Sequence, residues 1–338
     1  MRGYDRAAAE LRSALPPNPE ILDFIRFATL AANGHNVQPW RFAVRGGRTS
    51  ILPDLGRRTA AVDPDDHHLY ASLGCAAENF LIAAAASGRP GAMDIATGGD
   101  GRIDIDLARG ARQENALFDA IRERQSTRSD FDGRLVPRDD IRQLVNAARI
   151  DGVAVEIFTS DEDREAILDH VIAGNSAQMD DPAFVRELRD SIRFNAAEAL
   201  YARDGLFSAC SGNLTMSGWL GRRLFAMLYR KSAENDRYAS QLRTSAGVAV
   251  FVGERPDIAS WIDVGRSFQR FALQATALRI RHSHINQPVE VPSVRADFAQ
   301  WLGNRDARPD LVIRFGYAPP LPMSLRRPVA DVLIADTA

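Results

Sequence analysis

A run of alternating polar residues, Arg124-Gln125-Ser126-Thr127-Arg128, has the composition of an anion-binding segment. In an extended segment Arg124, Ser126 and Arg128 point to the same side, because side chains alternate along such a backbone. Two guanidinium groups and a hydroxyl group on one side can bind a phosphate through charge-assisted hydrogen bonds. A solvated charged linker is the alternative that the residues leave open, since most charge runs are solvated.

A second polar segment, Asn33-Gly34-His35-Asn36-Val37-Gln38-Pro39-Trp40, lies between a predicted helix and a predicted strand. Amide and imidazole groups on an irregular backbone can direct several hydrogen bonds at one ligand. Pro39 stiffens the end of the segment, and Trp40 offers a large apolar wall. The alternative is a helix end followed by a turn, which uses the same residue types and is favoured when they are considered alone.

Three further groups of polar residues give weaker signals. The spacing of His282 and His284 invites a metal site, but no cysteine or carboxylate partner lies nearby, so a loop that presents the amides of Asn286 and Gln287 is favoured. Arg326 and Arg327, before a proline, can meet a phosphate or be solvated. The remaining candidates have no motif spacing: His67-His68, expected at a surface or interface, and the isolated Cys75 and Cys210, expected as small buried residues.

The composition restricts the class of protein. The chain has 338 residues, of which 45% are hydrophobic and 25% charged, with a net charge of -2. The chain has no excess of basic residues that would indicate nucleic-acid binding, and we find no basic amphipathic helix that would indicate binding to a membrane surface. The sequence contains no phosphate-binding loop, no Gly-x-Gly-x-x-Gly dinucleotide motif and no Gly-x-Ser-x-Gly nucleophile motif. The first residues have no apolar run, so we expect no signal peptide.

Hydrophobic periodicity predicts the elements that hold these segments. Helices are predicted over 20–32, 63–87, 115–123, 139–148 and 260–280. Strands are predicted over 41–45 and 50–53, joined by a hairpin at Gly46-Gly47, and over 102–107, 153–159, 247–252 and 311–315. Between 159 and 247 lie further helical stretches, 161–173, 181–202 and 217–231. This insertion is too long for a plain loop and predicts either an extra helical layer or a lid.

Two stretches of the chain resemble each other. Residues 74–82 align with residues 265–273, and each stretch lies in a long helix that precedes a strand. The sequence therefore predicts an α+β fold of two tandem modules with antiparallel sheets flanked by helices. The first module covers 1–112 and the second 113–338, with the helical insertion at about 161–235.

These motifs together resemble those of the nitroreductase-like FMN flavoproteins, and more narrowly the tandem, single-chain Acg-type branch. The resemblance covers about 20–332. Asn36-x-Gln38-Pro39-Trp40 is similar to the family's flavin loop, with Asn33 and Gly34 where the family has serines. Arg124-Gln125-Ser126-Thr127-Arg128 is similar to its Arg-x-Ser-x-Arg segment. Asn286-Gln287-Pro288-Val289-Glu290 resembles the loop near the flavin ring, and Arg326-Arg327 the C-terminal basic pair at the phosphate.

The resemblance implies one FMN per chain. The first copy has the segment 33–40, here called the amide loop, but no counterpart of the segment 124–128, here called the arginine segment. The second copy has the arginine segment but no amide loop. The two deficiencies are complementary, so the modules are expected to form a pseudo-dimer with one complete site. The implied cofactor-binding residues are Asn33, Gly34, Asn36, Arg124, Gln125, Ser126, Arg128, Gln287, Arg326 and Arg327.

The implied activity is the reduction of an electron-poor small molecule, with NAD(P)H as the donor and no catalytic side chain, because the flavin carries the chemistry. Two alternatives remain open: an FMN-sequestering protein whose lid covers the flavin, and a flavin-free structural relative. We expect no nucleic-acid or membrane partner, either a monomeric pseudo-dimer or a homodimer, and a cytoplasmic location, or a periplasmic one if the natural start was trimmed.

Overall fold

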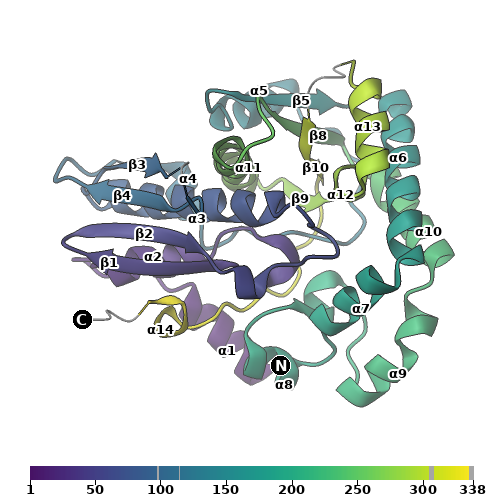
Figure 1. Ribbon diagram of the computed structural model, residues 1–338, viewed down its shortest axis with the longest axis horizontal. Helices are drawn as coiled ribbons and strands as arrows, with labels where there is room; N and C mark the ends of the chain where they lie inside the picture. Colours follow the sequence, from purple (N-terminus) through teal and green to yellow (C-terminus); the bar gives the residue numbers. More distant parts are fainter. Residues whose placement is uncertain (97–98, 114, 304–307, 335–338) are drawn as a thin grey trace.

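The computed structural model describes residues 1–96, 99–113, 115–303 and 308–334 (Figure 1). The predicted turn at Gly98–Gly101 lies partly outside the described residues. The fold is α+β, with two four-stranded antiparallel sheets and helices packed around them, as the sequence predicted.

The first sheet forms from residues 40–107. Its strands follow the order β1-β2-β4-β3. The hairpin between β1 and β2 turns at Gly46 and Gly47, with φ of 57° and 84°, where glycine avoids the Cβ penalty of a left-handed backbone. The elements of this half are α2 (Ile21–Thr29), η1 (Gly34–Asn36), β1 (Trp40–Arg45), β2 (Arg48–Pro53), η2 (Leu55–Arg57), α3 (His67–Ala86), β3 (Gly91–Ile95), β4 (Ile103–Leu107) and α4 (Ala116–Ala120).

The second sheet repeats this topology. Its order, β5-β8-β10-β9, matches the first when β1, β2, β3 and β4 are aligned with β5, β8, β9 and β10. The elements are α5 (Arg138–Ala147), β5 (Val153–Phe158), β8 (Gly247–Gly253), α11 (Ile258–Ala277), β9 (Arg281–His284), α12 (Gln287–Glu290), α13 (Pro292–Trp301) and β10 (Arg308–Gly316). The prediction of a loop from His282 was wrong, because residues 281–284 pair with β10.

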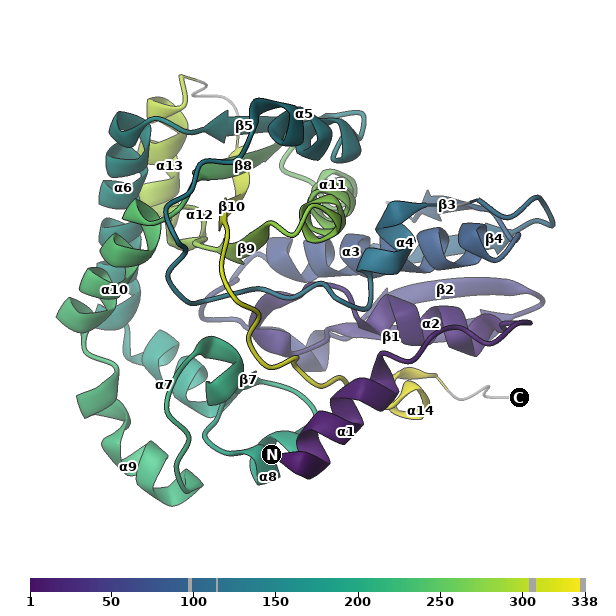
Figure 2. The same ribbon diagram turned by 180° about the vertical axis from the view of Figure 1, so that it is seen from behind.

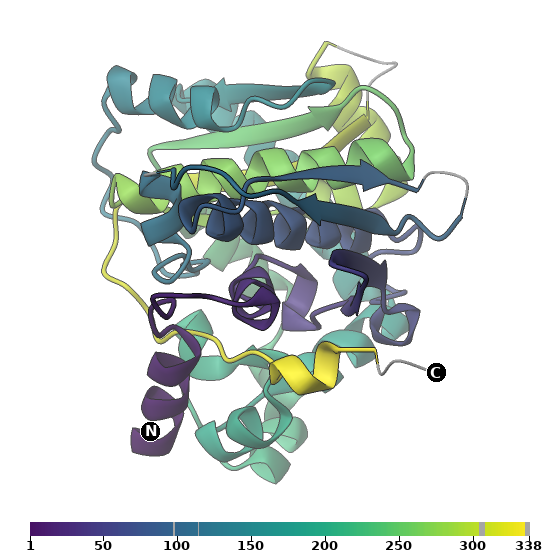
Figure 3. The same ribbon diagram turned by 90° about the vertical axis from the view of Figure 1, so that its left-hand side faces the viewer.

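The helices α3 and α11 run next to each other through the middle of the molecule (Figure 3). Two glycines permit this approach: a Cβ on Gly74 would overlap the carbonyl oxygen of Ile262, and a Cβ on Gly265 would overlap that of Ala71. The contacts are reciprocal, since each glycine meets the residue three positions before the other. Such self-complementary contacts are typical of a two-fold interface, and they match the alignment of 74–82 with 265–273.

Helix α3 is long and apolar enough to cross a membrane, but 83% of its most apolar window is buried inside the protein. Its side chains pack on the sheet of its own half and on α11, which explains an apolar surface on all sides. The prediction that Cys75 is a buried residue is confirmed, and so is that for Cys210.

The insertion between β5 and β8 is almost entirely helical. The predicted helix at 161–173 continues to Asp180, and the predicted helix at 181–202 is interrupted by a short strand. The elements are α6 (Asp161–Asp180), α7 (Pro182–Ser191), β6 (Ile192–Arg193), α8 (Ala196–Ala202), β7 (Leu206–Phe207), η3 (Ser208–Ser211), α9 (Gly218–Leu228) and α10 (Lys231–Arg243).

Both ends of the chain cross to other parts of the fold. Helix α1 (Arg2–Leu11) packs on the insertion, where the rings of Tyr4 and Phe207 are 4.8 Å apart. After β10 the chain passes α1 and reaches α14 (Val329–Val332) beside the first sheet (Figure 2), where the backbone N–H of Ile334 donates to the carbonyl of Phe42 at 2.8 Å. The module boundary at 112/113 stays a prediction.

Candidate functional site

Two adjoining cavities lie where the two halves and the insertion meet. The larger, about 180 Å³, is lined by the start of α3, the loop after α2, the β9–α12 connection and the inserted helices. The smaller, about 50 Å³, has four arginines in its lining and room for a few water molecules. Both cavities are lined by Ala32, Asn33, Arg128 and Leu206, so they form one elongated site with a wide end and a cationic end.

The loop after α2 has an unusual backbone. His35, Asn36 and Gln38 have φ of 44°, 56° and 56°, in the left-handed region that non-glycine residues seldom occupy. Such conformations cost about 1–3 kcal/mol each and persist where surrounding contacts impose them. Here Gln38 supplies those contacts. Its Nε2 donates to the carbonyl of Arg203 at 2.9 Å, and its Oε1 accepts from the backbone N–H of Arg327 at 2.7 Å.

Some polar side-chain atoms of this loop form hydrogen bonds within the protein, and others have no partner. Asn33 accepts from the backbone N–H of Gln38 at 2.9 Å, and the Nδ2 of Asn36 donates to the carbonyls of Gly205 and Leu325. Among the described residues, the buried Oδ1 of Asn36 and Nδ1 of His35 have no hydrogen-bond partner. Trp40 forms no wall of the site, because it is fully buried in the core beneath the first sheet.

The small cavity brings together four arginines from three parts of the chain: Arg12, Arg124, Arg128 and Arg326. Within the described ranges, none of the four has a carboxylate within ion-pairing distance. Burial lowers the pKa of Arg12 and that of Arg124 to about 10, and it also lowers the pKa values of Arg128 and Arg326. Buried charges are ordinarily paired, so this cluster lacks a counter-anion.

The four arginines differ in how far the protein itself uses them. Arg326 is occupied: its guanidinium donates to the carbonyls of Thr29 and Ala31 at 2.7 and 3.1 Å and so caps the end of α2. Arg124 donates to the carbonyl of Leu30 at 3.0 Å, and Arg12 to those of Ser324 and Ala8 at 2.9 and 3.5 Å; each leaves a buried Nε without a partner among the described residues. For Arg128 the described residues offer its guanidinium neither a hydrogen bond nor an ion pair, although it lines both cavities.

The rest of the arginine segment has mixed roles. Ser126 lines the small cavity, and its backbone bridges to His282 on β9. Gln125 also lines it, but its amide is bonded to both backbone groups of Leu321 and so anchors the C-terminal segment. Arg327 lies outside both cavities, where it approaches Asp54 at 3.7 Å and donates to the carbonyl of Asp331. Its assignment to the phosphate end is therefore not retained.

The wide end of the site is polar on one side. Gln287 donates through Nε2 to the hydroxyl of Tyr238 at 2.6 Å, and its buried Oε1 has no partner among the described residues. Gly174 on α6 allows the start of α12 to lie close to α6, because a Cβ on Gly174 would overlap the carbonyl of Gln287. His284 lies against the ring of Phe268, and burial together with Arg128 and Arg124 lowers its pKa to about 3, so it is neutral.

Glu290 and His68 form the far end of the wide cavity. Burial raises the pKa of Glu290 to about 7, and its Oε2 accepts from Gln178 at 2.6 Å. Burial lowers the pKa of His68 to about 3. Of the two expected places for His67-His68, a surface or an interface, the surface was wrong, because 1% and 8% of the two residues are exposed.

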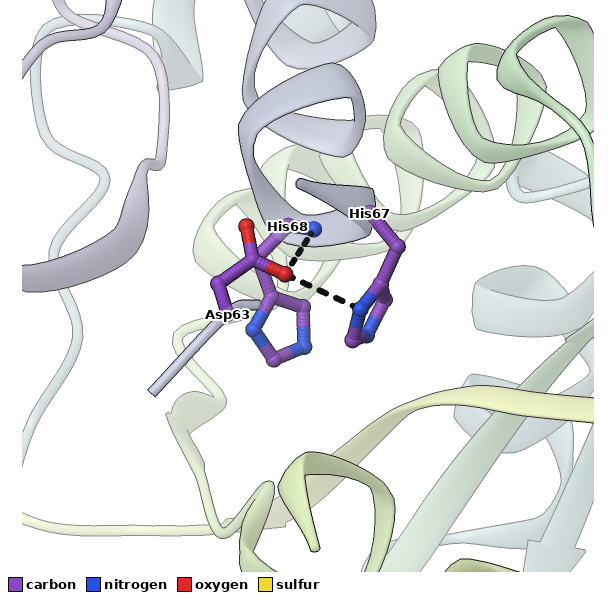
Figure 4. Close-up of side chains that lie close together, drawn as sticks. All are labelled: Asp63, His67 and His68. Atoms are coloured by element: carbon purple, nitrogen blue, oxygen red, sulfur yellow. Dashed lines mark hydrogen bonds and ion pairs between the residues drawn. The ribbon is translucent and has the colours of Figure 1, made fainter. Parts of the chain in front are cut away.

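Beside this end, Asp63, His67 and His68 gather at the start of α3 (Figure 4). Asp63 accepts from the backbone N–H groups of His68 and Leu69 and so caps the helix. Nδ1 of His67 lies 3.0 Å from Asp63 and 2.9 Å from Asp65. Burial acts to lower the pKa of His67, but these two carboxylates raise it to about 9. Asp63 and His67 therefore form a buried ion pair that uses Nδ1 of His67, while its buried Nε2 has no hydrogen-bond partner among the described residues.

Sequence reasoning missed Arg12 and Tyr238 as parts of the site, because their places depend on how α1 and α10 pack and no local motif marks them. The segment 282–290 was singled out, but His284 and Glu290 within it were given no role in binding. The assembled geometry defines a binding site for an elongated anionic ligand, with a phosphate-sized cationic end and a wider end that carries unused hydrogen-bonding groups.

No family model matches the chain. The chain is 24% identical over 350 residues to two proteins of Mycobacterium tuberculosis, "Putative NAD(P)H nitroreductase Rv3131" of strain H37Rv and "Putative NAD(P)H nitroreductase MT3217" of strain CDC 1551, with 97% of this chain and 95% of each relative covered. The resemblance to nitroreductases that the motifs indicated is thereby confirmed, while the narrower tandem branch stays a prediction.

Solved structures that resemble the chain include a Bacteroides fragilis nitroreductase with bound FMN, with a TM-score of 0.38 and 16% identity over 61% of this chain and 90% of that one. Another is the FMN-dependent nitroreductase NfnB of Mycobacterium smegmatis in complex with NADPH, with a TM-score of 0.38 and 18% identity over 60% of this chain and 87% of that one.

Proposed function

We propose that the protein is an FMN-dependent oxidoreductase that takes electrons from NAD(P)H and passes them to an electron-poor small molecule. The observation that carries this proposal is the cluster of four arginines at the small cavity, two buried and two half-buried, which has no carboxylate among the described residues; above all it is Arg128, whose guanidinium donors are unused. A dianionic phosphate would supply the missing counter-charge. The similarity to two mycobacterial proteins named as NAD(P)H nitroreductases supports the electron donor and the type of reaction, and the motif resemblance supports a flavin as the rest of the ligand.

The residues at the cationic end fit the FMN phosphate. Arg128, Arg124 and Arg12 have unused donors there, and Ser126 adds a hydroxyl. Arg326 supplies charge while it caps α2, so its role is electrostatic. Charge-assisted hydrogen bonds contribute about 1.5–3 kcal/mol each, so the cluster can hold the phosphate strongly even though some donors serve the protein.

The wide end fits a planar ring with polar edges. Oε1 of Gln287 can accept a hydrogen bond there, and Oδ1 of Asn36 can accept one from the part of the ligand that lies in the small cavity. Gly34 presents no Cβ, and a Cβ built there would meet nothing within 4 Å, so the loop leaves space on the cavity side. When bound, FMN supplies the hydride chemistry, so no protein nucleophile is required.

The two halves contribute unequally, which supports one FMN per chain. The connection 30–39 between α2 and β1 carries the amide loop, whereas the matching connection between α5 and β5 covers only 148–152. In the alignment of α3 with α11, Asn79 corresponds to Arg270. Asn79 donates to the carbonyl of Phe27 near the amide loop, but Arg270 pairs with Glu78 and donates to the carbonyl of Ala147. An ion pair thus occupies the second position.

The proposal is tested by mixing the FMN-loaded protein with NADPH or NADH under anaerobic conditions. Bleaching of the flavin absorbance by either donor is expected. Absorbance that stays unchanged, while dithionite bleaches it normally, would contradict a reductase and indicate that the inserted helices hold the flavin out of reach. Protein that stays colourless after FMN addition would overturn the flavin assignment altogether.

A further inference from the structure

The outer surface of the insertion carries an unusual concentration of exposed apolar side chains. Four of the eight large hydrophobic residues exposed on the described chain lie between residues 201 and 227: Tyr201, Leu214, Trp219 and Met227, with 95%, 83%, 67% and 59% exposure. Tyr201 and Trp219 are the only aromatic ones among the eight. Exposed apolar residues are ordinary when scattered, but a concentration of them marks an interaction surface.

The same surface is cationic. From residue 205 to residue 233 the chain has four basic and no acidic side chains, although its net charge is -2. Arg222 pairs with Glu198 and Lys231 with Asp180, while Arg223 and Arg230 form no ion pair with the residues that the structure describes. The positive charge of this segment is therefore only partly neutralised.

Both features lie on one face of α9. At 100° per residue, Trp219, Arg222, Arg223, Ala226 and Met227 fall within one arc, and all five are exposed. The opposite face holds the helix to the protein: Phe225 is buried, and Gly221 lies so close to the ring of Phe194 that a Cβ would overlap it. The exposed face has no partner element in the described structure.

We propose that this outer face of α9 docks the protein on an anionic lipid bilayer. A helix with aromatic and aliphatic residues among arginines binds in the interfacial plane, because the rings enter the headgroup region while the guanidinium groups reach the anionic headgroups. A second copy bound through the same face would bring like charges together.

This proposal departs from the expectation, drawn from the sequence, of no basic amphipathic helix and no membrane partner. That expectation rested on the net charge of -2, which conceals the local excess of four cations in residues 205–233. The proposal does not rest on the flavin assignment.

The test is sedimentation of the full chain with vesicles of phosphatidylcholine alone and of an equal mixture of phosphatidylcholine and phosphatidylglycerol. Binding to the mixed vesicles is expected, with a blue shift of tryptophan emission that Trp219→Ala removes. Each arginine near an anionic surface contributes roughly a fivefold factor to partitioning. Arg223→Glu with Arg230→Glu should therefore weaken binding at least roughly 25-fold, and added salt should weaken the wild type similarly.

The matched control lies at the opposite end of the molecule, on α5 and the turn before it (Figures 1 and 2). Leu135 is 75% exposed and Arg138 is exposed, so Leu135→Ala with Arg138→Glu should leave vesicle binding unchanged. Absence of binding to the mixed vesicles would overturn the proposal, as would equal losses in the control and α9 variants. A concentration-dependent dimer that Trp219→Ala dissociates, without vesicle binding, would show that a second copy covers this face instead.

Discussion

Replacing Arg128 by methionine separates the phosphate assignment from general effects on folding. Methionine keeps most of the apolar stem and removes the guanidinium, which the described residues leave without a partner. If Arg128 contacts the phosphate, the substitution removes about 1.5–3 kcal/mol of FMN binding. The dissociation constant of FMN should then rise roughly 10- to 150-fold.

The assay is titration of the apoprotein with FMN and, separately, with riboflavin, which lacks the phosphate, following the quenching of flavin fluorescence. Arg128→Met should weaken FMN binding and leave the weaker riboflavin binding nearly unchanged. Arg327→Met is the matched control, because Arg327 lies beside the site but outside both cavities. It should bind both ligands as the wild type does.

For the stability of the apoprotein, Arg128→Met is expected to have no unfavourable effect, in contrast to its effect on FMN binding. Burial lowers the pKa of Arg128 because its charge is uncompensated, so removing that charge should leave the free energy of unfolding unchanged or raise it. Equal losses of FMN and riboflavin affinity, or a strongly destabilised apoprotein, would refute the reasoning, since either would mean that Arg128 supports the fold and not the phosphate.

Three further predictions concern the surrounding structure. Asp63 and Asp65 raise the pKa of His67 to about 9, so the contribution of His67 to the free energy of unfolding is complete below about pH 6.5 and is lost as the pH rises through 9. Wild-type stability, measured by urea unfolding, should therefore decline over that range by up to about 3 kcal/mol. His67→Gln should lack this decline. Burial raises the pKa of Glu290 to about 7, so the ionised form is disfavoured in the folded protein and the free energy of unfolding falls as the pH rises from about 4.5 to 7. Glu290→Gln should remove that decline. A decline in the variant equal to that of the wild type would refute the assignment. Gly74→Ala and Gly265→Ala should each destabilise the protein by at least 1–3 kcal/mol in thermal unfolding, because the new Cβ overlaps a carbonyl of the facing helix. Gly99→Ala is the control and should be nearly neutral, because a Cβ there meets open space. Equal effects of the three substitutions would contradict the reciprocal packing.

The sequence predicted the elements whose signals are local. The hairpin at Gly46-Gly47 follows from glycines that tolerate positive φ, and the long helices follow from their periodicity. Strand β3 was not predicted, because residues 91–95 are largely exposed and form an edge with little apolar alternation. Strand β9 was mistaken for a loop, because its polar His-Ser-His run is buried only through pairing with β10 and packing on Phe268.

The site shows the same division. Arg124, Ser126 and Arg128 were found because alternation along an extended segment is a local property, and the structure places all three at the small cavity. Arg12 comes from a helix whose position depends on contacts with the insertion, and no pattern around it indicates that contact. Arg326 and Arg327 are adjacent in sequence, yet the chain direction sends one to the carbonyls of α2 and the other to Asp54.

The central claim is that one FMN binds across both halves of the chain, with its phosphate among the arginines. Titration of the apoprotein with FMN at a protein concentration well above the dissociation constant tests it most directly. The account predicts a single break at one FMN per chain, with Arg124→Ala plus Arg128→Ala abolishing that break. A break at two FMN per chain, or an unchanged break in the double variant, would contradict it.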